Sequence, residues 1–502
     1  MMSLISLLQT YVSCAAAAAA GMEDVFDLLH KLFLHASNDE IAELATLDFS
    51  GCGALTGLPL GQLAALTVLP ESLGQLTALT TLKLSGCRAL KRLPGSLGQL
   101  TALTVLDLSA CYALTELPKS LGQLTALTTL KLSGCRALTR LPRSLGQLTA
   151  LTTLTTMITP ITLATLATPT TPTIVSGCWV LTRLPESLDQ LTALTTLNLV
   201  DCHTLTGLPD SLGQLTALTT LNLVDCHTLT GLPDSLGQLA ALTILDLGGC
   251  HALTWLPESL GQLTAVATLN FSGCWALTRL PESLGHLTLI THLDFKLCER
   301  LTRLPESLGR LAALTMLNFS WCCALTGLPD SLGQLAALTK LDLSECHALT
   351  GLPESLGQLA ALTKLDLNNC HALTGLPESL GQLAKLAYLD LNNCLALIRL
   401  PESLGSLVSL SFLDLHRCGA LQSLPWSFAF LPKRAIINIT KLTGLVFPPK
   451  SASISAIRTF LLINHHALKL FYLILIGRRR VRRLPAELWW LIWYEYFVEQ
   501  NQ

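Results

Sequence analysis

A cysteine that returns every 24 residues constrains this chain more than any other feature. The interval holds without a slip from Cys178 to Cys418, and the segment Leu191 to Gln214 is repeated letter for letter from Leu215 to Gln238. A fixed period between about 20 and 50 residues is the signature of a stacked solenoid, in which each repeat packs on its neighbours. The 502 residues therefore predict one long array of similar repeats, flanked by shorter segments.

Each repeat follows the pattern L-x-x-L-x-L-x-x-C-x-x-L and then L-P-x-S-L-x-x-L. The alternation of Leu197, Asn198 and Leu199 predicts a short strand whose leucines turn inward while Asn198 faces outward. Pro209 suits the first turn of a short helix, and Gly213 can end that turn. A repeat this small buries its leucines only against its neighbours, so the strands should form a parallel sheet along the array.

The repeat, written here as LTTLNLVDCHTLTGLPDSLGQL, resembles the leucine-rich repeats of plant intracellular disease-resistance receptors of the Toll-like class and of Ras-pathway scaffold proteins. The resemblance runs from about Leu44 to Leu445. It implies an α/β fold, a leucine-rich-repeat solenoid or horseshoe, with a parallel sheet on the concave face and short helical or 3-10 limbs on the convex face. It also implies protein recognition, with a role in defence or signalling. The chain has no G-x-x-x-x-G-K-[ST] phosphate loop, so the nucleotide switch of those receptors is not expected here.

Three segments differ in character. Residues 1–43 predict an N-terminal segment and helical cap, with a signal peptide left open by the small apolar residues at its start. Residues 44–445 form the predicted array, and the charge-free, proline-containing stretch at 155–175 predicts an irregular break within it. A last repeat without cysteine is expected around Ile437. Residues 446–502 predict a C-terminal helical, basic and aromatic segment.

Two alternatives concern the C-terminal segment. Thr459 to Gly477 has nearly the length of a membrane span, and arginines follow it. Polar residues interrupt the stretch, which favours a buried or interfacial helix over a transmembrane one. Arg482 to Phe497 resembles the first helix of F-box motifs, so the alternative function is that of a ubiquitin-ligase adaptor.

The column cysteines are interpreted as structural. In this repeat class the position takes Asn or Cys, whose buried side chain bonds the backbone where the chain leaves the strand. A long column of reduced thiols predicts a cytoplasmic protein. Histidines follow several of these cysteines, but adjacent residues of an extended chain point to opposite sides, so we expect no metal site and no cofactor. The predicted structural ladder consists of Cys202, Cys226, Cys250, Cys274, Cys298, Cys322, Cys346, Cys370, Cys394 and Cys418.

Charge and periodicity exclude two classes of function. The net charge of −2 provides no basic field of the kind that attracts nucleic acid. Serines and histidines recur with the repeat and do not converge on a single place, whereas a catalytic site requires a singular constellation. We therefore expect neither nucleic-acid binding nor enzymatic activity.

The candidate binding site lies on the concave face, in the second half of the array. There the outward strand positions change from a monotonous series of Thr and Asn to charged and aromatic residues, which are typical of recognition patches. We expect a net negative, aromatic-edged patch that binds a protein or peptide ligand through a basic segment. The candidate partner-binding residues are Lys340, Asp342, Lys364, Asp366, Tyr388, Asp390, Phe412 and Asp414.

Overall fold

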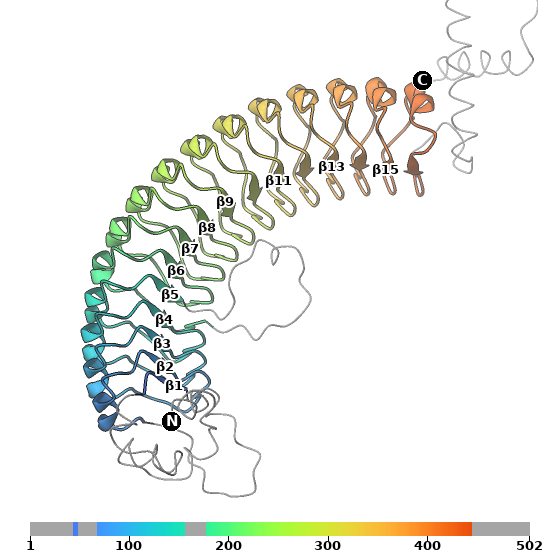
Figure 1. Ribbon diagram of the computed structural model, residues 1–502. Coiled ribbons are helices and arrows are strands. Elements are labelled where there is room, and N and C mark those ends of the chain that lie inside the picture. Colours follow the sequence, from blue (N-terminus) through green and yellow to red (C-terminus); the bar gives the residue numbers. More distant parts are fainter. Residues whose placement is uncertain (1–43, 49–67, 156–176, 444–502) are drawn as a thin grey trace, which may run out of the picture. The chain divides into compact units, whose positions relative to one another are not determined.

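The computed structural model describes residues 44–48, 68–155 and 177–443 (Figure 1). These residues belong to two compact units, the first ending at Leu277 and the second beginning at Thr278. Within each unit the strands form one layer and short 3-10 helices form the other. The predicted N-terminal cap, all but the first residue of the predicted break and the C-terminal segment with its F-box-like stretch lie outside the described residues.

The first unit contains nine described strands and eight described 3-10 helices. The strands are β1 (Thr46–Asp48), β2 (Thr81–Lys83), β3 (Val105–Asp107), β4 (Thr129–Lys131), β5 (Thr153–Thr155), β6 (Thr196–Asn198), β7 (Thr220–Asn222), β8 (Ile244–Asp246) and β9 (Thr268–Asn270). The helices are η2 (Glu71–Gln75), η3 (Gly95–Gln99), η4 (Lys119–Gln123), η5 (Arg143–Gln147), η7 (Glu186–Gln190), η8 (Asp210–Gln214), η9 (Asp234–Gln238) and η10 (Glu258–Gln262).

The second unit contains seven described strands and seven described 3-10 helices. The strands are β10 (His292–Asp294), β11 (Met316–Asn318), β12 (Lys340–Asp342), β13 (Lys364–Asp366), β14 (Tyr388–Asp390), β15 (Phe412–Asp414) and β16 (Ile436–Asn438). The helices are η11 (Glu282–His286), η12 (Glu306–Arg310), η13 (Asp330–Gln334), η14 (Glu354–Gln358), η15 (Glu378–Gln382), η16 (Glu402–Ser406) and η17 (Trp426–Phe430). In the part of the chain that the structure describes, no helix combines the length and apolar character needed to span a bilayer.

Within each unit, every strand pairs in parallel with the next strand along the chain. In the first unit Leu197 faces Leu221, the residue at the same place in the following repeat. In the second unit β15 pairs with β16, the predicted repeat without cysteine. β5 and β6 are also neighbours, Thr153 pairing with Thr196 across the segment that contains the predicted break. The prediction of an α/β solenoid with a parallel sheet and 3-10 limbs is confirmed.

The core of each unit is a stack of leucines. Leu197 and Leu199, on either side of Asn198, are fully buried. Burial of a leucine side chain contributes roughly 1.5–3 kcal/mol relative to exposure, and each repeat adds several. Threonines beside the strands add bonds between repeats, since the Thr219 backbone N–H and hydroxyl both donate to the Thr195 carbonyl, the hydroxyl at 3.1 Å. Stability therefore accumulates through contacts between nearest neighbours.

The helical limb differs from the prediction in two details. Pro209 precedes η8 as its N-cap, with φ −70° and ψ 150°, so the helix begins one residue later than expected. Gly213 lies inside η8 and does not end it. A Cβ atom at Gly213 would stand 2.4 Å from the Ser235 carbonyl oxygen of the next repeat, so glycine is required there for close packing between helices.

Candidate partner-binding face

The candidate residues lie on four neighbouring strands of the second unit, β12 to β15. Pairing in register places Lys340 beside Lys364, then Tyr388, then Phe412, and aligns the four aspartates in a second column. The four strands thus bring all eight predicted residues onto one face of the sheet, which we call the strand face of the second unit.

A connected group of side chains occupies the centre of this face. The Lys364 ammonium lies 3.2 Å from Asp366 Oδ2 and 4.8 Å from the centroid of the Tyr388 ring. The Tyr388 hydroxyl donates to Asp390 Oδ2 at 2.9 Å. Tyr388 and Phe412 stack with their ring centroids 4.6 Å apart and an interplanar angle of 8°. Both rings are half-buried, so each is held in place and still offers an edge to a ligand.

The aspartates are less exposed than an outward-facing column would be. Asp366, Asp390 and Asp414 are 9%, 8% and 9% exposed. Each carboxylate accepts the backbone N–H two residues further on, as Asp390 Oδ1 does from Asn392 at 2.9 Å. The first unit behaves alike, because Asn198, at the strand position expected to face outward, is only 3% exposed and accepts the Val200 N–H. The polar side chain turns back to close the end of its own strand.

Burial changes the titration of this column. It raises the pKa of Asp366, and the nearby Asp342 carboxylate adds to the effect. Burial also raises the pKa of Asp390. The pKa of Tyr388 is raised first by burial and then by its hydrogen bond to Asp390, so the phenol remains a donor. The ionised carboxylates of this face are therefore destabilised by the loss of surrounding water. A cationic ligand would offset that cost.

The other two candidates differ in their contacts. Lys340 is exposed, and its strand neighbour is Lys364. Asp342 accepts both the backbone N–H and the hydroxyl of Ser344, the latter at 2.7 Å. Lys364, by contrast, forms an ion pair with Asp366, the aspartate of its own strand.

The column cysteines lie behind the strands, away from this face. All ten predicted ladder cysteines are buried. Cys226 Sγ donates to the Leu199 carbonyl of the preceding repeat at 3.3 Å, and Cys370 bonds Leu343 in the same way. Burial raises the pKa of Cys226 and of Cys250, so these thiols stay protonated. A buried, protonated thiol is a weak donor suited to structural use.

The sequence analysis did not predict that the aromatic and histidine rings after the cysteines of the first unit stack on one another. They form a stacked column, in which His203 and His227 have centroids 4.5 Å apart and Trp275 lies 3.8 Å from His251. Trp179 begins the column beside the Arg136 guanidinium. The histidines of this column are half-buried between aromatic ends, and burial lowers the pKa of both His227 and His251. The 24-residue spacing of these rings was the available signal.

Comparisons with known proteins agree with this architecture. The family described as Leucine Rich Repeat matches residues 361–383. The fold is similar to that of a leucine-rich-repeat protein of Leptospira interrogans, with 26% identity, a TM-score of 0.52 and coverage of 83% of this chain and 99% of that one. It is also similar to the leucine-rich-repeat domain of the type III effector XopL, with 30% identity over 42% of this chain and 72% of that one and a TM-score of 0.36. The plant peptide hormone receptor RGFR1, solved in complex with RGF2, shows 18% identity over 76% of this chain and 87% of that one, with a TM-score of 0.32. No curated protein gives a significant match.

Proposed function

We propose, from the premise that this chain is a leucine-rich-repeat protein, that it is a non-enzymatic recognition scaffold. Its ligand is a protein or peptide that presents a basic segment to the strand face of the second unit. The resemblance of the repeat to those of plant disease-resistance receptors supports a role in defence or signalling. The long column of buried cysteines supports a reducing compartment such as the cytoplasm.

One observation carries this proposal: the stacked pair of Tyr388 and Phe412 stands beside a column of desolvated carboxylates. Aromatic side chains held in fixed positions lose little entropy on binding and commonly act as anchors. Carboxylates at the edge of such an anchor orient a basic partner and raise its association rate. Lys364 already pairs with Asp366, whereas β14 and β15 have aromatic residues in place of a lysine. The negative character is therefore strongest around Asp390 and Asp414.

The test is an affinity pulldown with the full chain, followed by binding measurements on the retained ligand. Tyr388→Ala should weaken binding by more than about 1–2 kcal/mol, the loss expected for an anchor residue. Asp390→Asn should reduce the association rate and its salt dependence, because the amide oxygen keeps the acceptor for the Asn392 N–H while the charge is lost, and the amide nitrogen can donate to the Tyr388 oxygen in place of the present bond.

Two controls separate binding from folding. Tyr388→Phe keeps the ring stack and removes the hydroxyl bond to Asp390, so it should retain most of the affinity. Thr220→Ala changes the same position of β7 in the first unit and should leave binding unchanged. Equal losses from Thr220→Ala and Tyr388→Ala, with unchanged melting temperatures, would show that the ligand contacts another surface.

A further inference from the structure

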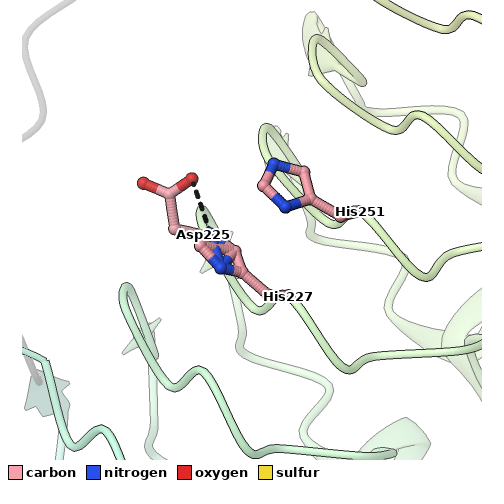
Figure 2. A group of neighbouring side chains, drawn as sticks. All are labelled: Asp225, His227 and His251. Atoms are coloured by element: carbon pink, nitrogen blue, oxygen red, sulfur yellow. Dashed lines mark ion pairs between the residues drawn. The ribbon is translucent and has the colours of Figure 1, made fainter.

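A second group of polar side chains lies in the first unit, in the stacked column that follows the cysteines. Figure 2 shows Asp225, His227 and His251, which come from two consecutive repeats. One ligand atom from each of the three residues lies within 4.8 Å of the other two. Asp225 Oδ1 and His227 Nε2 are 3.5 Å apart. All three side chains are half-buried, so they are partly held and still reachable from solvent.

The stack brings the two imidazoles together. His227 and His251 occupy the same position in neighbouring repeats, and their rings have centroids 4.2 Å apart at an angle of 11°. The column continues on both sides through His203 and Trp275, which limits the sideways movement of the pair. Two imidazole edges are thus presented side by side.

Glycine at position 249 makes room for the carboxylate. Asp225 has a φ of 59°, in the left-handed region, and the corresponding residue of the next repeat is Gly249 with a φ of 71°. A Cβ atom on Gly249 would lie 2.0 Å from Asp225 Oδ1. The carboxylate therefore reaches over the neighbouring repeat, toward His251, through space that any other residue would fill.

The second unit contains a useful internal comparison. Glu345, His347 and His371 repeat the arrangement of one acid and two stacked histidines, with Glu345 Oε2 3.1 Å from His347 Nε2. There the corresponding glycine positions hold asparagines. Asn369 donates to Glu345 Oε1 at 2.6 Å, and Asn393 lies 3.1 Å from His371 Nε2. Side-chain amides thus saturate the acid and one imidazole in the second unit.

In the first unit Gly249 and Gly273 stand at those two positions and bring no amide. We propose that Asp225, His227 and His251 bind a first-row divalent cation of the Zn²⁺ type. Two imidazoles and a carboxylate are a ligand set that suits such cations, with at least one position left for water or a ligand. The sequence argument against a metal concerned Cys and His of the same repeat, whereas these ligands belong to two repeats.

Metal binding requires the three ligand atoms to approach one another. Ligand atoms around a tetrahedral Zn²⁺ are about 3.3 Å apart, given bond lengths of about 2.0–2.1 Å. The Asp225–His227 pair is already near this spacing, at 3.5 Å. The ligand atom of His251 lies within 4.8 Å of the other two, and rotation of the His251 side chain out of its stack on Trp275 would supply the remaining approach.

The test is a titration of the chelator-treated full chain with Zn²⁺ alone, followed by calorimetry, and with Co²⁺, followed by visible absorption. Gly249→Asn should abolish this site, because its Cβ would take the space of the Asp225 carboxylate and its amide could bond that carboxylate as Asn369 bonds Glu345, while asparagine tolerates a positive φ. His251→Ala should weaken binding by at least about tenfold, the loss that even changes in outer ligands produce. His371→Ala, in the saturated group of the second unit, is the matched control and should leave the affinity unchanged.

Circular dichroism of each variant establishes that it is folded before titration. Loss of one bound ion in Gly249→Asn and His251→Ala, with binding retained in His371→Ala, supports the site. Wild-type affinity in both first-unit variants overturns the proposal, as does absence of Zn²⁺ binding to the wild-type chain.

Discussion

Replacement of Gly357 by alanine tests the close approach of consecutive 3-10 helices. An added Cβ would lie 2.5 Å from the Ser379 carbonyl oxygen and 2.6 Å from its Cβ, below any normal contact. Because one of these atoms is backbone, the two repeats must separate locally. Overpacking of this kind costs about 1–3 kcal/mol. Gly351, six residues earlier in the same repeat, has no atom within 4 Å of the added Cβ.

The pair of variants isolates the contact. Both substitutions reduce the conformational entropy of the unfolded chain by a similar amount, worth about 0.4–1 kcal/mol of stability. This contribution cancels when the stabilities of the two variants are compared. Gly357→Ala should therefore be less stable than Gly351→Ala by about 1–3 kcal/mol. Because every 1.4 kcal/mol is a factor of ten, amide hydrogen exchange across η14 and η15 should be roughly 5–150 times faster in Gly357→Ala. Mass spectrometry of peptides from these helices measures the rate. Equal exchange in the two variants would refute the packing argument.

Three further predictions follow from the same structure. Burial and the nearby Asp225 carboxylate raise the pKa of Asp201 from 3.8 to about 6, so ionisation of this side chain destabilises the folded state as pH rises between these values. Asp201→Asn should thus raise the urea midpoint at pH above about 6, with an advantage that shrinks toward pH 4; a pH-independent difference would contradict this assignment. Native thiol labelling should modify half-exposed Cys323 well before buried Cys322, and the reverse order would show that the column is open. Cys226→Ala removes the donor to the Leu199 carbonyl and should lower the free energy of unfolding by about 1–3 kcal/mol in urea titrations, whereas Cys226→Ser should cost less.

Strand positions and register were predictable over most of the array because both depend on a period that repeats without a slip from Cys178 to Cys418. Leu197 and Leu221 face each other since nothing but the 24-residue interval decides their pairing. The same interval identified Tyr388 and Phe412 as neighbours. The 24-residue interval predicts which residues occupy the same position in neighbouring repeats. It therefore predicts strand pairing and neighbouring side chains well wherever the repeats are regular.

Side-chain direction and packing distance were not accessible in this way. Alternation along a strand puts Asn198 on the outer face, but a short polar side chain can turn back to the N–H two residues on, and Asn198 does so. Gly213 suits a helix end by residue type, and only the distance to Ser235 reveals that it serves packing. The group of Asp225, His227 and His251 depends on glycine at position 249, a local exception to the repeat.

Equivalent pairing also has a genetic consequence. Residues 191–214 and 215–238 are identical in sequence, so recombination between their coding segments would remove or add a whole repeat in frame. A chain lacking residues 215–238 can pair β6 with β8 in the register that β7 uses, because Ile244 occupies the position of Thr220. Alleles that differ in copy number should therefore all fold. Selection could then act on the number of ligand-facing positions without first having to rescue a misfolded intermediate.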